Sequence, residues 1–134
     1  MKKNIAFVCV HNSCRSQIAE AFGKLYLSKI TNVYSAGTIL ANQINQDAIR
    51  LMRKLYDIDL EKTQKPKLIS SLPKIDYLIT MGCNVECPLI PCKVHLDWGI
   101  EDPTYFLEEK FIKTIKMIKK KVLSLKVEIK KHFN

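Results

Sequence analysis

Residues 9–15, with the sequence Cys-Val-His-Asn-Ser-Cys-Arg, have the residue types and the spacing of a loop that binds an oxyanion and attacks it. Successive backbone N–H groups can curl around a tetrahedral oxyanion, and the planar guanidinium of Arg15 can hold two of its oxygens. The same positive potential favours the thiolate form of Cys9, which is the nucleophilic form of a cysteine. The spacing therefore predicts a nucleophile aimed at the central atom of a bound dianion.

The residues between the cysteine and the helix that follows should line the anion site. Ser16 can donate a hydrogen bond to the Cys9 sulfur, and Asn12 is suited to a left-handed turn that braces the loop. If Cys9 were only a small buried residue, the motif would be accidental, but the strand, loop and helix pattern around it favours the functional interpretation. The predicted anion-binding residues are Val10, His11, Asn12, Ser13, Cys14, Arg15 and Ser16.

A carboxyl group stands in a second turn. Asp102-Pro103 follows a short predicted strand at 94–96, so Asp102 should lie at the same edge of the sheet as Cys9. By itself an Asp-Pro pair indicates only a turn. Beside the cysteine loop, it predicts that Asp102 protonates a leaving oxygen.

Three further cysteines are clustered later in the chain, at Cys83, Cys87 and Cys92. With five cysteines and no export signal, a structural disulfide framework is not expected. Cys83 and Cys87 resemble half of a zinc site, but a second ligand pair is missing, because the other cysteines belong to the anion loop and the histidines are scattered. We therefore favour thiol chemistry, in which a second thiolate attacks an adduct on Cys9 and leaves a disulfide, and we expect no cofactor.

The elements that position these residues follow from apolar patterning. Apolar runs predict strands at 5–8, 33–35, 75–80 and 94–96. Helical spacing of apolar residues predicts three helices. The apolar face of the first consists of Ile18, Ala19, Phe22, Leu25 and Tyr26, and that of the second, which Asn45 or Asp47 caps, consists of Ile49, Met52 and Leu55. The apolar face of the third consists of Phe111, Ile115, Ile118, Val122, Leu125 and Ile129. The alternation predicts a single catalytic α/β domain over 1–134, a three-layer sandwich with helices on both faces of a four-stranded parallel sheet.

Composition narrows the classes of partner. The chain has 134 residues, of which 47% are hydrophobic and 26% charged, values of an ordinary globular domain. No apolar run approaches the ~18 residues of a membrane span and no secretion signal is present, so we expect a cytoplasmic protein. The formal net charge is +9. Because no basic stretch is interleaved with base-stacking aromatics, we attribute this excess to compositional bias and expect neither nucleic acid nor a membrane as partner.

Residues 7–20 resemble the active-site segment of the low-molecular-weight tyrosine phosphatase superfamily. Within them, Asn-Ser-Cys-Arg-Ser-Gln at 12–17 is similar to the thioredoxin-coupled arsenate reductases, whereas the phosphatases more often have proline where Gln17 stands. The similarity covers nearly the whole chain and continues at 34–37, 79–83, 87–88 and 98–103.

The resemblance implies reduction of arsenate to arsenite, with thioredoxin or a similar thiol reductant as partner. Cys9 attacks arsenate held by the loop and Arg15, and Asp102 assists the departure of an oxygen. Cys83 then attacks the Cys9–arsenic adduct and arsenite leaves. Cys87 converts the Cys9–Cys83 disulfide into Cys83–Cys87, which thioredoxin reduces.

The resemblance also implies supporting roles. Ser35 braces the loop through Asn12, and Cys92 is an extra thiol that could replace Cys87 or be idle. Some reductases of this type bind potassium near the positions of Asn12, Ser35 and Thr63 and an acidic residue, but Lys65 stands where they have that acidic residue. A fixed ammonium there would disfavour a cation, so we predict no metal.

Two other functions remain open. A phosphatase would use the same loop, because phosphate and arsenate are nearly isosteric, and Tyr105 resembles the aromatic that phosphatases place beside an aryl phosphate. An oxidation-sensing module would form a local Cys9–Cys14 bond. His11, where the superfamily often has glycine, either adds charge near the dianion or is an exposed loop residue.

Overall fold

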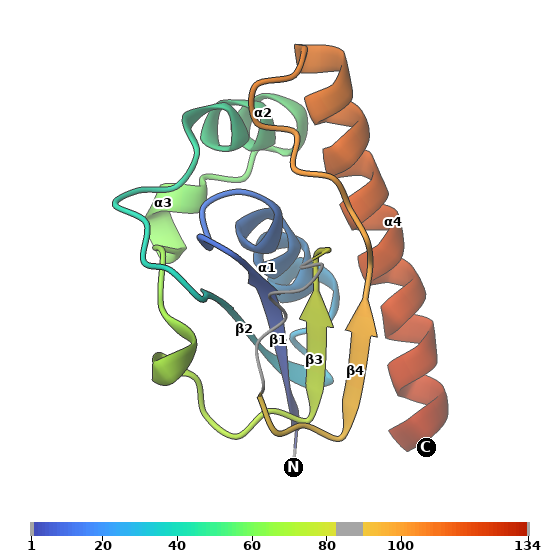
Figure 1. Cartoon of the computed structure of the whole chain (residues 1–134). Coiled ribbons are helices and arrows are strands. Elements are labelled where there is room, and N and C mark those ends of the chain that lie inside the picture. Colours follow the sequence, from blue (N-terminus) through green and yellow to red (C-terminus); the bar gives the residue numbers. More distant parts are fainter. Residues whose placement is uncertain (1, 83–89, 134) are drawn as a thin grey trace.

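A computed structural model of the protein describes residues 2–82 and 90–133. The predicted thiols Cys83 and Cys87 lie outside the described residues. Four parallel strands form one sheet in the order β2-β1-β3-β4 (Figure 1). They are β1 (Lys3–Cys9), β2 (Thr31–Gly37), β3 (Tyr77–Thr80) and β4 (Val94–Asp97). All four predicted strands are present, and the third begins two residues later than predicted.

The carboxyl ends of the strands meet at one edge of the sheet. Cys9 at the end of β1 pairs with Gly37 at the end of β2. Val8 pairs with Thr80 at the end of β3, which pairs in turn with Asp97 at the end of β4. The loops that follow these strands therefore gather where open α/β sheets bind ligands.

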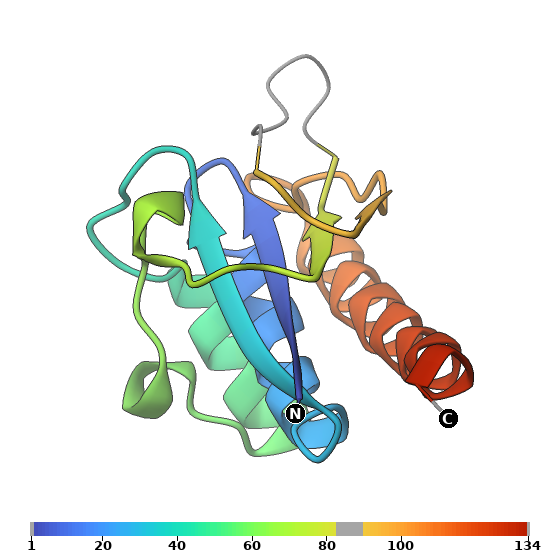
Figure 2. The same cartoon turned by 90° about the horizontal axis from the view of Figure 1, so that it is seen from below.

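Three long helices share one face of the sheet (Figures 1 and 2). They are α1 (Arg15–Tyr26), α2 (Gln46–Tyr56) and α4 (Glu108–Phe133), and they bury one large apolar cluster against β1 and β3; the short helix α3 (Leu60–Thr63) follows α2. The other face carries a smaller cluster around Ala6 and Val8, covered in part by the 3₁₀ helix η1 (Ile69–Ser71). The predicted fold class is confirmed, although within residues 2–82 and 90–133 the helical cover on the second face is a single turn.

The predicted helix faces are confirmed most completely for α4. All six residues of its apolar stripe are buried, and α4 packs against α1. In the two shorter helices the prediction was wrong for Leu25 and Leu55, which are 58% and 39% exposed. Both lie in the final turn of their helix, where the next residue, Tyr26 or Tyr56, packs against the apolar cluster. Within residues 2–82 and 90–133, no helix has the length and apolarity needed to cross a membrane.

Candidate active site

The loop between β1 and α1 encloses a cavity of about 190 Å³. The backbone turns through Asn12, whose φ of 53° lies in the left-handed region that asparagine tolerates. α1 begins directly after the loop. The N-cap residue of α1 is Cys14, and its side chain makes no hydrogen bond to the N–H groups of the first turn. The first N–H groups and the positive end of the helix are therefore available to an anion. The cavity is lined by Cys9, Val10, His11, Ser13, Cys14, Arg15 and Asp102.

The side chain of Cys9 is held by the first turn of α1. Its Sγ lies 2.8 Å from Oγ of Ser16. Because Oγ of Ser16 accepts a hydrogen bond from Nδ2 of Asn12 at 2.8 Å, its own proton is free to point at the sulfur. A hydrogen bond donated to the sulfur stabilises negative charge there. The predicted contact between Ser16 and the Cys9 sulfur is present.

Arg15 is buried, and two carbonyl groups fix its guanidinium. Its Nη1 donates to O of Ile100 at 2.7 Å and to O of Met81 at 3.2 Å. Its Nε is the one buried side-chain nitrogen or oxygen in the described part of the chain that lacks a hydrogen-bond partner. Leaving such a donor unpaired costs about 1–3 kcal/mol. Arg15 is therefore oriented by the protein and short of one acceptor, which an oxyanion in the cavity would supply.

The fully buried side chain of Asn12 is the centre of the network that braces the loop. Its Nδ2 donates to Oγ of Ser16 and, at 2.9 Å, to Oγ of Ser35. Its Oδ1 accepts from the backbone N of Lys67 at 2.9 Å and from Nε2 of Gln17 at 3.0 Å. The contact between Ser35 and Asn12 that the resemblance implied is therefore present.

Two buried amide side chains extend this network. Nε2 of Gln17 also donates to the backbone O of Asn12 at 2.9 Å and of Lys65 at 3.0 Å. Nε2 of Gln64 donates to Oε1 of Gln17 at 2.8 Å. Sequence analysis singled out Gln17 only as a departure from proline, and it missed Gln64, because a lone glutamine among lysines carries no signal.

A buried carboxylate stands behind Ser35. Glu20 is 3% exposed, accepts a hydrogen bond from Ser35, and pairs with Nζ of Lys24 at 2.6 Å and of Lys67 at 3.4 Å. The sequence analysis assigned the positive charge that would disfavour a bound cation to Lys65, and this was wrong. The Lys65 side chain is exposed, and its backbone carbonyl accepts a hydrogen bond from Nζ of Lys67. Two ammonium groups already compensate Glu20, so these residues do not fit a bound cation. An acidic residue among the apolar positions of a predicted helix is the signal that could have revealed Glu20.

Gly37 allows β2 to approach the loop. A Cβ atom there would lie 2.7 Å from O of Val10 and 2.8 Å from N of Asn12. The N of Gly37 donates to O of Lys67 at 2.8 Å, which keeps the bracing segment in place. The close approach excludes every residue with a side chain unless the loop moves.

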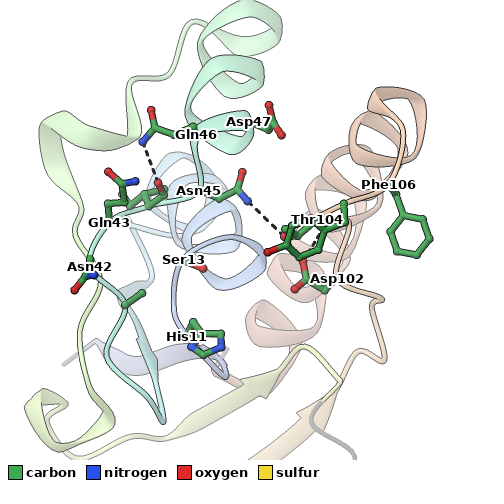
Figure 3. Close-up of a pocket in the computed structure, with 13 residues that line it drawn as sticks. His11, Ser13, Asn42, Gln43, Asn45, Gln46, Asp47, Asp102, Thr104 and Phe106 are labelled. Atoms are coloured by element: carbon green, nitrogen blue, oxygen red, sulfur yellow. Dashed lines mark hydrogen bonds between the residues drawn. The ribbon is translucent and has the colours of Figure 1, made fainter.

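Asp102 reaches the cavity from the segment between β4 and α4 (Figure 3). It is exposed, and its Oδ1 accepts hydrogen bonds from N of Thr104 at 3.0 Å and from Oγ1 of Thr104 at 2.7 Å. The structure thus brings Cys9, Arg15 and Asp102 to one cavity, as the sequence predicted.

A wider cavity of about 810 Å³ adjoins the first and shares His11, Ser13 and Asp102 with it (Figure 3). Amide side chains from 42–46 line one side, and Tyr105 and Phe106 line another. His11 is an exposed loop residue that borders both cavities, and Tyr105 is fully exposed.

The remaining described thiols differ in environment. Burial raises the pKa of Cys14 far above its usual range, and the negative charges of Asp102 and Cys9 raise it further. Cys14 is therefore an uncharged S–H group. Cys9, Cys14 and Cys92 are free thiols, so the Cys9–Cys14 bond of an oxidation sensor is not present. Cys92 is half-buried against the smaller apolar cluster, on the face of the sheet opposite to the cluster that contains Cys9.

Comparisons with known proteins agree with this geometry. A family model described as low molecular weight phosphotyrosine protein phosphatase matches residues 4–134. An arsenate reductase of Brevibacillus brevis is 42% identical over 106 residues, which cover 76% of this chain and 78% of that protein. An arsenate reductase of Bacillus cereus strain Q1 is 43% identical over 107 residues, with coverage of 76% and 78%.

Solved structures give the same picture. An arsenate reductase in the phosphate binding state has a TM-score of 0.83 and 30% identity, covering 95% of this chain and 98% of that chain. A thioredoxin-dependent arsenate reductase of Corynebacterium glutamicum has a TM-score of 0.76 and 31% identity, and the match covers 96% of this chain and 62% of that one. The structural similarity therefore extends over nearly the whole chain.

Proposed function

We propose that this chain, which belongs to the low molecular weight phosphotyrosine protein phosphatase family, reduces arsenate to arsenite. In this reaction Cys9 is the nucleophile and thioredoxin is the electron donor. The observation that carries the proposal is the cavity shared by Cys9, Arg15 and Asp102. The two curated relatives named arsenate reductase support arsenate as the oxyanion. The thioredoxin-dependent reductase of Corynebacterium glutamicum supports thioredoxin as the reductant.

The first step is displacement at arsenic. Arsenate binds with its oxygens on the loop N–H groups and on Nε of Arg15, the donor that lacks a partner within the protein. The Cys9 thiolate attacks arsenic, so that an S–As bond forms while one As–O bond breaks. Asp102 gives a proton to the departing hydroxyl group of hydrogen arsenate, which leaves as water.

The second step transfers two electrons. The Cys83 thiolate attacks the Cys9 sulfur, the electron pair of the S–As bond passes to arsenic, and arsenite leaves with arsenic reduced from As(V) to As(III). The two thiolates are oxidised to a Cys9–Cys83 disulfide. Cys87 then attacks Cys83 and frees the Cys9 thiolate, and the dithiol of thioredoxin reduces the Cys83–Cys87 disulfide.

These relay roles come from the resemblance, and two described contacts support them. The carbonyl of Met81 accepts a hydrogen bond from Arg15, so the chain passes beside the anion loop two residues before Cys83 in the sequence. Cys92 packs on the opposite face of the sheet from the cluster of Cys9, which favours Cys87 over Cys92 as the thiol that closes the relay.

Hydrolysis of aryl phosphates is the second candidate function. It is favoured by the fully exposed Tyr105, which lines the cavity next to the anion loop, and it requires Cys9, Arg15 and Asp102 but neither relay cysteine. The anion loop alone does not separate the two reactions, because phosphate and arsenate have nearly the same shape and charge.

A coupled assay distinguishes them. The reduced protein is incubated with arsenate, thioredoxin, thioredoxin reductase and NADPH, and the loss of NADPH is followed. We expect loss that depends on arsenate. Absence of that loss, together with rapid hydrolysis of p-nitrophenyl phosphate, would make the protein a phosphatase.

Substitutions of single thiols test the division of labour. Cys83→Ser should abolish arsenite release but spare hydrolysis of p-nitrophenyl phosphate. Cys87→Ser should release one arsenite per protein and trap the Cys9–Cys83 disulfide, which peptide mass spectrometry detects. Cys92→Ser is the control and should sustain turnover. Multiple turnovers by the Cys87→Ser protein would assign the last step to another thiol.

A further inference from the structure

Thr104 is the junction between the two loops of the cavity. Its backbone N and its Oγ1 both donate to Oδ1 of Asp102, at 3.0 Å and 2.7 Å. The same Oγ1 accepts a hydrogen bond from Nδ2 of Asn45 at 3.4 Å (Figure 3). A threonine hydroxyl has one proton and two acceptor sites. Here the proton is donated to Asp102 and one acceptor site is taken by Asn45.

The two bonds to Oδ1 make the oxygens of Asp102 unequal. An oxygen that accepts two donated hydrogen bonds is stabilised without a proton, so the proton of the carboxylic acid belongs on the other oxygen. Oδ2 receives neither of the bonds from Thr104. The Asp102 side chain is therefore turned so that one oxygen is held by its own loop and the other can face a leaving oxygen in the cavity.

Asn45 connects this arrangement to the anion loop. Its backbone N donates to O of Ser13 at 2.7 Å, and its Oδ1 caps α2 by accepting from N of Ala48 at 3.0 Å. Its Nδ2 is the group that reaches Thr104. One residue thus touches the loop that binds the anion, the start of a helix and the segment that carries the acid.

We propose that Thr104 is a positioning residue for proton donation, which holds Oδ1 of Asp102 so that Oδ2 carries the transferred proton. Asn45 fixes the position of Thr104, and through it of Asp102, relative to the anion loop. The inference rests on the proposed function only in that Asp102 acts as the acid. A purely structural turn would require the bond from the backbone N of Thr104 but not its hydroxyl.

The hydroxyl is tested by a pair of substitutions. Thr104→Val removes the hydroxyl and keeps the shape, and it should lower kcat about tenfold with KM changed less than about twofold, the effect of one lost hydrogen bond. Thr104→Ser restores the hydroxyl and should return kcat to within about twofold of the wild type. Thr114→Val, which removes a hydroxyl from α4, is the control and should leave both constants unchanged. Equal losses in the valine and serine proteins would overturn the proposal.

A double-mutant cycle shows whether Thr104 acts through Asp102. In an Asp102→Ala background the carboxyl is gone, so adding Thr104→Val should change kcat by less than about twofold. Additive losses would mean that Thr104 acts elsewhere and would overturn the proposal. Asn45→Ser keeps a good helix cap but loses the reach to Thr104, and it should lower kcat about threefold, because a 3.4 Å bond is weak.

The cycle is run with arsenate and with a series of aryl phosphates. If the wild type hydrolyses the esters but reduces no arsenate, the proposed function fails while Thr104 is still tested on the esters. With the esters, the effect of Thr104→Val should grow with the basicity of the leaving phenol, because poorer leaving groups need the proton more. An effect equal for all phenols would overturn the role in proton donation. A wild type inactive on both substrates would overturn both proposals.

Discussion

The two loops that form the cavity are held in different ways. In the anion loop, Asn12 and Ser16 are fully buried, and the Asn12 side chain bonds to Ser35 and to the backbone of Lys67, which are distant in sequence. In the segment after β4, Asp102 is exposed, and its carboxylate bonds to Thr104, two residues further on.

This difference matches what each loop does in the proposed reaction. Donors for an anion stabilise developing charge best when they are oriented before it arrives, which requires support from the buried interior. A proton donor must meet an oxygen that moves during the reaction, so an exposed segment with local support is sufficient. We expect substitutions in the anion loop to impair binding and chemistry together, and substitutions of the acid to impair chemistry alone.

Arg15→Lys should have the largest effect. The lysine ammonium cannot both reach the two carbonyls that Arg15 holds and present a planar donor to the anion, so kcat/KM should fall about 10³-fold. Phosphate should also fail to raise the Tm of the variant. Arg53→Lys changes an exposed arginine paired with Asp59 and should leave both measurements as in the wild type. Retained anion stabilisation in Arg15→Lys would contradict the assignment of the guanidinium to binding.

Asp102→Asn should separate chemistry from binding. Loss of the proton donor should lower kcat about 10²-fold, within the usual range for general acid catalysis. The rise in Tm with phosphate should equal that of the wild type, because Asp102 is not one of the anion's donors. If phosphate no longer stabilised the variant, the contrast between the two loops would be lost.

Gly37→Ala should weaken the brace of the anion loop. The new Cβ would lie within 2.8 Å of the backbone at Val10 and Asn12, so the loop must shift, at a cost of about 1–3 kcal/mol in the free energy of unfolding. Urea denaturation measures this cost, and weaker stabilisation by phosphate should accompany it. In Gly23→Ala the added Cβ would contact side-chain atoms of Val33 and Phe7 in the core instead. That variant can change stability but should leave phosphate binding as in the wild type.

Cys14 should show the smallest effect. Because burial raises its pKa, the thiol stays protonated at pH 8 and should not react with iodoacetamide in the native protein. Peptide mass spectrometry should find it alkylated only after denaturation. Cys14→Ser keeps a small, uncharged hydrogen-bond donor at this position, so kcat/KM should stay within about threefold of the wild type. Rapid alkylation of native Cys14 would instead support an oxidation-sensing role.

Much of the fold follows from patterns that are local in the chain. The apolar runs of the strands and the six-residue stripe of α4 were predicted because the side-chain periods of strands and helices are properties of the backbone itself. The exposed Leu25 and Leu55 were mispredicted because a period gives the direction of a side chain but not whether another element covers it.

The sequence by itself also determined which groups meet in the cavity, since the spacing of Cys9 and Arg15 around a strand, loop and helix is a local property, and Asp102 lies in a recognisable Asp-Pro turn. The partners that orient these groups were decided only by the tertiary structure. Gln64, Lys67 and Thr104 have no local pattern that marks them, and Glu20 gains its role only where Ser35 and two lysines meet it. A hydrogen bond depends on distance and angle between atoms, and for residues far apart in the chain those are set by how the whole molecule packs.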